Sequence, residues 1–427
     1  MPAMEKIPVT SPERQHIDNT EFTFAWVLKH LNENDHVWKS ITAGRRRLQY
    51  ISFRTIGDGK GFASKIYMLT MEFSDGKAYR VVMKVPTVDI LSAKVQVGGE
   101  QNADAVVDNV KSAVLMGHAR ECEMYSKHYR NGMPMPRIFA LKDIVPDRER
   151  GAILMEYLGD KAANVPFYRS FTVEQLINIS RCLARLHAYS MSLSETDMKK
   201  LEAREQTADT MVYIFKAFAS LEQNPNASRL SNFAKIKHLM QTSDFVRYCL
   251  FGVNKELGMK PIIVHGDMWS NNIFINKHED GTFGNEPLAF IDWQAAHSGS
   301  VGEDLARLYA SCQADIRREV EQVGLNAYYE TFQREMKRRS LDIVHSKEQV
   351  VLSYRRLFVY QALLLVAGGN FLFRNENLED ENMKRVWEAR TENQHVRSQL
   401  AIDDAIRILE EDIPEWLHKN HTFMRTD

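Results

Sequence analysis

Two aspartates and an asparagine in the second half of the sequence have a spacing that suits phosphoryl transfer. In HGDMWSNNIFIN, residues 265–276, apolar residues on both sides predict two short strands with the polar residues on the loop between them. Asp267 precedes Asn272 by five positions, and Asp292 follows the apolar stretch LAFI. In such an arrangement the first aspartate orients an acceptor hydroxyl, while the asparagine oxygen and the second aspartate ligate Mg²⁺.

Each of these residues has a simpler interpretation when it is taken alone. Asp267 could cap a turn, and Asn271 and Asn272 could be ordinary loop residues. However, both carboxylates occur in the required order, each at the end of a predicted strand, with the asparagine between them. The combination favours Asp267 as the catalytic residue, with Asn272 and Asp292 as metal ligands.

The first third of the sequence supplies a candidate phosphate-binding loop. In GDGKGFAS, which separates two predicted strands, Gly57, Gly59 and Gly61 permit a tight turn and a close approach of the backbone to phosphate oxygens, and Ser64 ends the candidate loop. The loop lacks the Gly-Lys-Ser/Thr ending of a Walker A motif, so a plain hairpin turn is the alternative. It predicts nucleotide binding only together with other groups.

A lysine inside an apolar strand is the next candidate. In VVMKV, Val82 and Lys84 lie on the same strand face, where the valine would cover adenine and the lysine would reach the α- and β-phosphates. A solvent-facing lysine is the alternative, but the surrounding residues are apolar. Glu121 shares a helix face with apolar residues, whereas Glu123 lies beside charged ones. We therefore expect Glu121 to pair with Lys84.

The segment MEYL, residues 155–158, ends a predicted strand where the β-rich part of the chain gives way to helices. At such a junction the Glu156 carbonyl and the Leu158 amide would bind the edge of adenine. An apolar strand end without a binding role is the alternative.

The predicted elements divide the chain into two parts. A helix over residues 20–31 and strands over 48–56, 65–73 and 78–85 precede mostly helical sequence beyond Gly159. This order predicts an α+β fold with a β-rich N-terminal lobe, residues 1–157, and a mainly helical C-terminal lobe, residues 158–427.

Together the motifs resemble the aminoglycoside phosphotransferase/choline kinase superfamily, and most closely its ecdysteroid-kinase-like (CHK kinase-like) family. HGDMWSNN and IDWQAAHSGSVGEDLARL carry the most specific part of the resemblance, which extends over roughly residues 50–310. It implies a bilobal protein-kinase-like fold, use of ATP and Mg²⁺, and the residue roles given above. Asp304, in EDLARL, falls in a family motif, and we expect a structural role for it.

A small molecule is the expected phosphate acceptor. Gly266 stands where a protein kinase carries arginine before its catalytic aspartate, and no APE sequence follows Asp292. A nucleotide-binding partner protein without catalysis is the main alternative, although such a protein need not keep Asp267. A metal hydrolase using His265 and Asp267 would leave Lys84 and the glycine loop without a purpose.

The acceptor itself is predicted from weaker signals. Trp269 and Trp293 neighbour the proposed catalytic residues and could either stack on a substrate or pack in the core. The apolar late sequence, including residues 361–373, favours a hydrophobic alcohol, sterol-like or xenobiotic, over a choline-type or aminoglycoside acceptor.

Composition and net charge limit the partners and the cellular location that we expect for this protein. The chain has 427 residues, a formal net charge of −1 and four widely spaced cysteines. These values predict no nucleic-acid or membrane surface and favour a reducing, cytoplasmic location. The apolar run of residues 358–369 is shorter than a membrane span and predicts a buried helix.

Overall fold

The computed structural model describes residues 6–44, 46–57, 64–87, 103–146, 148–203, 207–209, 211–212, 229–372, 380–418 and 421–422. The chain forms two compact units: Met1–Tyr129 with Met135–Lys161, and Arg130–Pro134 with Ala162–Asp427. The boundary lies at residues 161 and 162, slightly beyond the predicted one at 157 and 158. Gly59 and Gly61 of the candidate phosphate loop lie outside the described residues.

The first unit is built around one antiparallel sheet with the strand order β1-β2-β3-β4-β6-β5. Its described elements are β1 (Ile7–Pro8), α1 (Phe24–Asn34), α2 (His36–Thr42), β2 (Leu48–Ile56), β3 (Ser64–Phe73), β4 (Ala78–Pro86), α4 (Ala103–Ser126), β5 (Ile138–Lys142) and β6 (Ala152–Glu156). The glycine at the β3–β4 turn, Gly76, has a φ of +79°, as expected for the Asp-Gly hairpin signal.

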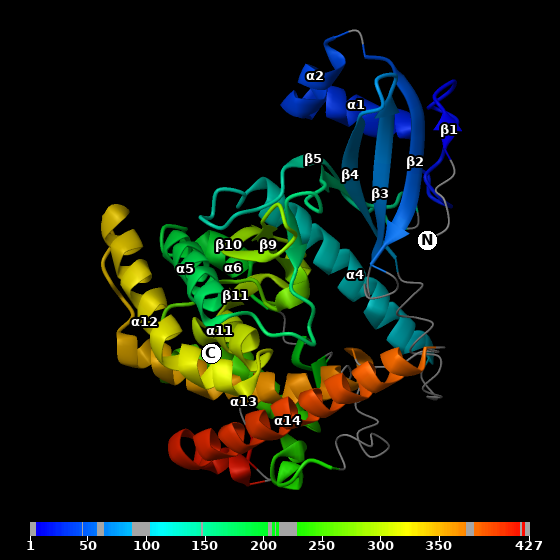
Figure 1. The fold of residues 1–427 in the computed structure, drawn as a ribbon. Helices are drawn as coiled ribbons and strands as arrows, with labels where there is room; N and C mark the ends of the chain where they lie inside the picture. The colour runs from blue at the N-terminus through cyan, green and yellow to red at the C-terminus, as the bar shows by residue number, and fades with distance from the viewer. Residues whose placement is uncertain are drawn as a thin grey trace. The chain divides into compact units, whose positions relative to one another are not determined.

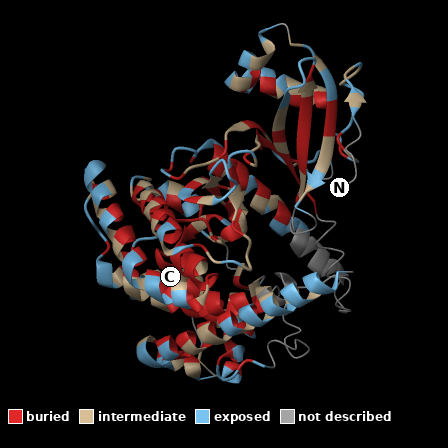
Figure 2. Ribbon diagram, viewed as in Figure 1, coloured by how far each residue is buried: buried red, intermediate tan, exposed pale blue. Residues whose placement is uncertain are grey.

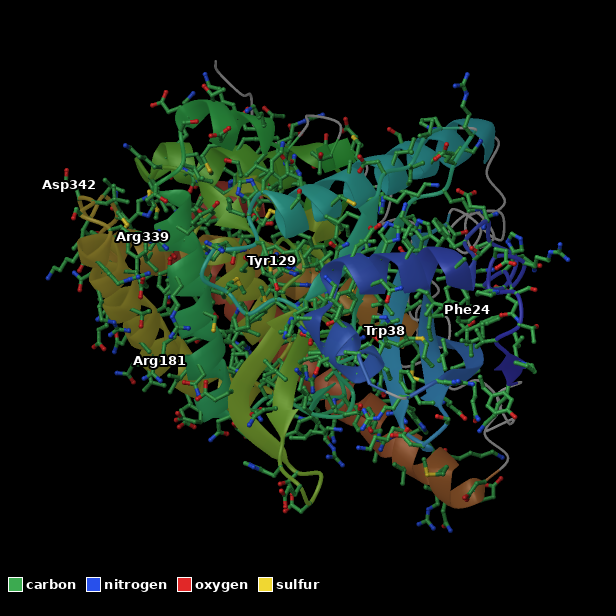
Figure 3. The ribbon with its side chains drawn as sticks, turned by 90° about the horizontal axis from the view of Figure 1, so that it is seen from above. Phe24, Trp38, Tyr129, Arg181, Arg339 and Asp342 are labelled. Carbon is green, nitrogen blue, oxygen red and sulfur yellow. The ribbon has the colours of Figure 1, made fainter. Side chains whose placement is uncertain are left out.

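One face of this sheet packs against helices α1 and α2. Thr23 caps α1 by accepting a hydrogen bond from the Trp26 amide, and the buried side chains of the helix recur at helical spacing. Figure 3 labels Phe24 and Trp38, the large core residues that these two helices contribute. Val81, Met83 and Val85 of β4 belong to the same core. Because side chains alternate along a strand, Val82 and Lys84 point to the opposite face.

The second unit is mainly helical. Its described elements are β7 (Ala162–Asn164), α5 (Val173–Ser190), α6 (Glu195–Lys200), α9 (Ser243–Arg247), α10 (Val253–Glu256), β8 (Ile262–Val264), β9 (Ile273–Lys277), β10 (Phe283–Phe290), β11 (His297–Gly299), α11 (Gly302–Ala310), α12 (Ala314–Arg338), α13 (Lys347–Leu372) and α14 (Glu381–Asp412). Single helical turns occupy Phe233–Lys235, Lys237–Met240, Tyr248–Gly252, Ser270–Asn272, Trp293–Ala295 and Pro414–Leu417. Figure 1 labels many of these elements and colours the chain by residue number.

Helices α5, α11, α12 and α13 form the core of this unit around two small antiparallel sheets, β10-β9-β7 and β11-β8. Buried residues are concentrated in these central helices (Figure 2). Thr172 and Gln175 form a capping box that begins α5. At the start of α11, Gly302 lies against the backbone of Ser353 in α13, so that any larger residue would clash there.

Helix α13 is longer than the apolar run predicted from sequence. Its stretch Lys347–Gly368 is the one segment in the described ranges that is long and apolar enough to cross a membrane, so the run of residues 358–369 underestimated the length of the apolar helix. However, 78% of the most apolar window is buried inside the unit, as expected for a core helix.

The predicted fold class is confirmed. The first unit is β-rich and the second mainly helical, and strands predicted over 48–56, 65–73 and 78–85 occur within one residue of those limits. All pairings between the named strands of the described ranges are antiparallel. The loop that carries Asp267 joins β8 to β9 in the second unit, as expected.

Candidate active site

Asp267 is held by contacts to both of its carboxylate oxygens. Arg307 Nη2 donates to Oδ1 at 3.1 Å, and Trp269 Nε1 donates to Oδ2 at 3.1 Å. Asn272 Nδ2 donates to Oδ2 at 3.0 Å and to the main-chain oxygen at 2.9 Å. The side chain is partly exposed, at 32%. It is therefore fixed in one orientation and still accessible to a substrate.

Strand pairing brings the two predicted metal ligands together. Phe290 pairs with Ile273, and the Ile291 N–H donates to the Asn272 main-chain oxygen at 3.0 Å. Asp292, the next residue, has a φ of +67° and a ψ of +59°. This left-handed conformation is uncommon for a residue other than glycine and is often found at functional sites. This backbone geometry was not predicted from the sequence.

The start of the loop is anchored by Asp304 of α11. Its carboxylate accepts hydrogen bonds from the backbone amides of His265, at 2.7 Å, and Gly266, at 2.9 Å. His265 Nδ1 accepts the Asp267 amide, and its Nε2 donates to the Ile291 carbonyl at 3.0 Å. Asp304 thus has the structural role that we expected, because it fixes the backbone just before the catalytic residue.

Gly266 is required by the shape of this loop. Its φ is +80°, and a Cβ atom added here would lie 2.3 Å from the Ala295 carbonyl oxygen. An arginine, which protein kinases carry at this position, would not fit without moving the backbone.

Buried charges lie beside the anchor. His297 Nε2 is 3.3 Å from Glu303 Oε2, and His297 Nδ1 bonds the Ala295 carbonyl. Burial lowers the pKa of His297, but the neighbouring Glu303 carboxylate outweighs this effect and raises it to about 9. Burial, together with the nearby Glu303 charge, raises the pKa of Asp304 to about 7, although its two backbone hydrogen bonds act in the opposite direction.

Sequence reasoning missed Arg307 as a site residue. It lies three positions after Asp304 on α11, so that both side chains lie on the same helix face. That spacing was a usable signal. Without the fold, however, nothing indicated that this face of the helix meets the catalytic loop.

Arg307 and Trp269 also line a small pocket in the second unit. Its apolar lining comes from Phe167, Trp269, Ala310, Leu364 and Leu365, and its polar lining from Arg307, Ser311 and Gln361, with Gly368 in the last two turns of α13. The volume is about 30 Å³. The Trp269 and Phe167 rings meet edge to face, with centroids 5.6 Å apart. The pocket is a candidate acceptor site because two residues that hold Asp267 form part of its wall.

The two tryptophans predicted near the catalytic residues have different environments. Trp269 lines the pocket, whereas Trp293 is fully buried, donates to the Phe290 carbonyl and packs on His265, with ring centroids 4.6 Å apart. Trp293 is therefore a core residue, and only Trp269 can contact a substrate in the pocket.

In the first unit, Lys84 and Glu121 form the predicted ion pair. Lys84 Nζ is 2.5 Å from Glu121 Oε2, and both side chains are buried. Glu123, the rejected alternative, instead pairs with Arg120 and Lys127 on the surface of α4. The two glutamates therefore lie on the helix faces predicted from the sequence, Glu121 on the buried face and Glu123 on the charged one.

The remaining residues that were predicted to bind the nucleotide, and that the structure describes, also lie in the first unit. The Glu156 side chain is bound by Arg137, whose Nε lies 2.9 Å from Oε2. The largely buried Leu158 is not in a strand, and its N–H donates to no group in the part of the chain that the structure describes. A buried amide without a partner suits an adenine edge. Gly57 has a φ of +91°, and Ser64 is buried opposite Pro86.

The donor set suits Mg²⁺ better than a transition metal. No group of three or more His, Cys, Asp or Glu side chains that could hold a metal occurs among the described residues. Mg²⁺ usually takes only one or two protein carboxylates and completes its shell with phosphate and water oxygens. Because the Asn272 amide nitrogen bonds Asp267, its oxygen is the atom suited to ligate a cation, together with Asp292.

One unit contains a buried Lys–Glu pair, and the other contains an Asp–Asn loop. This combination defines the class of kinase-like phosphotransferase folds. The chain belongs to the DUF1679 family, described as "Uncharacterized oxidoreductase dhs-27", whose profile matches residues 49–413. It is 25% identical over 333 residues to the protein of that name from Caenorhabditis elegans, covering 76% of this chain and 40% of the relative. More than half of that relative therefore lies outside the match.

A second relative carries a kinase-like name. The chain is 26% identical over 292 residues to "Uncharacterized kinase-like protein D1044.1" of C. elegans, covering 66% of this chain and 74% of the relative. The predicted resemblance to the phosphotransferase superfamily is thus confirmed as a resemblance. The narrower ecdysteroid-kinase-like assignment stays a prediction.

Solved structures with a related arrangement include phosphotransferases. A putative aminoglycoside phosphotransferase from Ralstonia eutropha is 12% identical, with a TM-score of 0.44 and coverage of 90% of this chain and 97% of that one. Ethanolamine kinase from Plasmodium vivax is 13% identical, with a TM-score of 0.41 and coverage of 90% and 92%. At these TM-scores the overlap carries no functional conclusion.

Proposed function

We propose that this protein is an ATP- and Mg²⁺-dependent phosphotransferase that transfers a phosphoryl group to the hydroxyl of a small molecule. The observation that carries the proposal is the Asp267–Asn272 contact of 3.0 Å on a loop whose backbone is fixed by Asp304. Mg²⁺–ATP would supply the phosphoryl group and neutralise its charge. In the chain itself, Asp267 would orient the acceptor hydroxyl, and Asn272 with Asp292 would hold the metal.

The first unit would hold the nucleotide. Lys84, kept in place by Glu121, would bind the α- and β-phosphates, and Val82 on the same strand face would cover the adenine. Gly57 begins the candidate phosphate loop and Ser64 ends it. The Glu156 carbonyl and the Leu158 amide, which has no partner among the described residues, would bind the adenine edge. A buried Lys–Glu pair of this kind is part of kinase catalysis.

The name oxidoreductase favours a different reaction, but the described fold does not support it. Dinucleotide binding of the Rossmann type requires a parallel sheet with a glycine-rich turn into a helix. In the described ranges the named strands pair only antiparallel. The name belongs to a longer protein, of which the matched part is 40%.

For the acceptor we propose an apolar alcohol, sterol-like or xenobiotic. The pocket beside Asp267 is lined mainly by aromatic and aliphatic side chains. With a volume of about 30 Å³, a sterol would require the lining side chains to move apart, whereas a smaller alcohol needs less movement. Comparing kcat/KM for a steroid alcohol, choline and kanamycin tests this choice. A tenfold preference for either cation, about 1.4 kcal/mol, would contradict the apolar acceptor.

The reaction class is tested by Mg²⁺-dependent ATP turnover with a panel of alcohols. Asp267→Asn should lower kcat by about 10²–10⁴ because it removes the group that orients the hydroxyl, and nucleotide affinity should stay near that of the native protein. Asp197→Asn, at a position whose side chain is 47% exposed, is the matched control. ATP binding without any turnover would indicate a non-catalytic nucleotide-binding protein, and turnover of NAD(P)H would refute the proposal.

A further inference from the structure

The pocket beside Asp267 has a charge that limits which acceptor it can hold. Among the described residues, Arg307 is the only charged side chain in its lining. Arg307 bonds Asp267 Oδ1 at 3.1 Å and is 24% exposed, so that its guanidinium lies where the reacting hydroxyl must arrive. The Asp267 carboxylate offsets part of this charge, but Arg307 lines the pocket and Asp267 does not, so a cationic acceptor in the pocket lies nearer to the guanidinium and is repelled by it.

A second cation lies behind the pocket wall. Arg397 of α14 is 2% exposed, and its Nη1 donates to the carbonyl oxygens of Phe167 and Ser311, two lining residues. No carboxylate bonds Arg397 within the described ranges, and its Nε atom has no hydrogen-bond partner there. Because the site is buried, this charge is poorly screened and adds to the positive potential in the pocket.

One residue of the pocket lining carries a buried acceptor atom that lacks a donor among the described residues. Gln361 of α13 lines the pocket and is 2% exposed, and its Oε1 atom has no hydrogen-bond partner among the described residues. A buried carbonyl oxygen without a donor destabilises the protein, and a ligand that supplies a donor removes this cost.

We propose that the pocket accepts neutral or anionic alcohols that carry a second hydrogen-bond donor, and that it excludes cationic alcohols. Arg307 would set the charge preference, and Gln361 would bind the donor. This inference rests on the proposed phosphotransferase function, and it names Arg307 and Gln361 as residues that determine acceptor specificity.

Four benzyl alcohols of nearly equal shape test the proposal. They carry methyl, hydroxyl, carboxylate or aminomethyl at the 3-position. Their dissociation constants are measured by titration calorimetry, and their kcat/KM values with ATP and Mg²⁺. For the native protein, the carboxylate and hydroxyl compounds should bind on the order of tenfold or more tightly than the aminomethyl compound.

Variants assign this preference to single residues. Arg307→Gln should reduce the carboxylate-to-aminomethyl ratio about tenfold, and Arg307→Lys should keep most of it. Ratios within one variant are compared, so a general loss of activity through Asp267 cancels. Gln361→Leu should remove the preference for hydroxyl over methyl. Arg338→Gln, an exposed arginine of α12, is the control and should change neither ratio.

The outcomes separate this inference from the reaction class. Equal or tighter binding of the aminomethyl compound, unchanged ratios in Arg307→Gln, or no binding of any probe would overturn the inference. The expected order of binding without a phosphorylated product would support the pocket and refute the phosphotransferase. Phosphorylation of the probes without any charge preference would support the phosphotransferase and refute the inference about the pocket.

Discussion

Lys84 and Glu121 form a buried ion pair whose members should differ in importance for catalysis. Lys84→Met should lower kcat/KM for ATP about 10²-fold or more, because the phosphate-binding charge is lost. This factor corresponds to a loss of a few kcal/mol of transition-state stabilisation. Glu121→Gln should lower kcat/KM less, because the lysine remains but is poorly oriented. Steady-state kinetics with ATP measure both effects, and near-native activity of Lys84→Met would refute the role of this lysine.

A double variant separates catalysis from folding. Removing one member of a buried pair leaves the other charge without compensation and costs about 3–5 kcal/mol of stability. The combination Lys84→Met/Glu121→Gln should regain much of that stability and stay inactive. Denaturant unfolding of the three variants provides this control.

The metal ligands are tested through the magnesium requirement. Asp292→Asn should abolish activity at any practical Mg²⁺ concentration, because a carboxylate is lost from a hard-cation site. Asn272→Ala should raise the Mg²⁺ concentration needed for half-maximal activity. Asp280→Asn, on an exposed turn, is the control. If Mg²⁺ titration curves were unchanged in both variants, neither residue would be a ligand.

The candidate site was predictable where type and spacing determine chemistry. Lys84, Glu121, Asp267, Asn272 and Asp292 were all named from the sequence, and the structure pairs the first two and places the other three on adjoining strand ends. Arg307 and Gln361 were missed because their relevance depends on which helix faces meet. A polar Gln361 within an apolar helix was a signal, but it did not indicate an open pocket.

Helix α11 and the preceding strand β11 combine several charges in the core, and this predicts a dependence of stability on pH. In the folded state the pKa of His297 is about 9, above its ordinary 6.5, so folding favours the protonated form. The stabilisation is complete below about pH 6.5 and is lost as the pH rises to about 9. The pKa of Asp304 is also raised, to about 7, so protonation of this carboxyl likewise stabilises the folded state, and this contribution is lost at lower pH than that of His297.

The free energy of unfolding of the native protein should therefore fall by about 2–3 kcal/mol between pH 6.5 and 9. His297→Gln should be less stable at pH 6.5, because Glu303 loses its partner, and should show a flatter pH dependence. Urea unfolding at several pH values measures both, with the exposed His278→Gln as control. An equal slope in native protein and His297→Gln would show that another group titrates.

Secondary structure was predictable in the first unit because patterns there are local. Alternating strands, a capped helix and an Asp-Gly turn have signals within a few residues, and the observed strands match them closely. The buried charge cluster of His297, Glu303 and Asp304 was not predictable, because its members are stabilised by packing between α11, β8 and β11 rather than by any local pattern.

For the whole protein, nucleotide binding should be visible as stabilisation. A non-hydrolysable ATP analogue with Mg²⁺ at 100 times its dissociation constant should add about 2.7 kcal/mol to stability and raise the melting temperature. Lys84→Met should lose this shift at the same concentration. Differential scanning fluorimetry measures it, with NADPH as the comparison. Stabilisation by NADPH and not by the ATP analogue would favour the reaction named in the oxidoreductase relative.

Helix α11 carries Asp304, which anchors the catalytic loop, Arg307, which holds Asp267, and Ala310, which lines the pocket. Its first residue, Gly302, also lies directly against α13. Evolution therefore cannot reshape the pocket by shifting this helix, since any displacement would also disturb the reacting carboxylate. New acceptors would have to arise from exchanges of single side chains on α13, such as Leu364 and Leu365. Relatives with different substrates should accordingly differ there and keep α11.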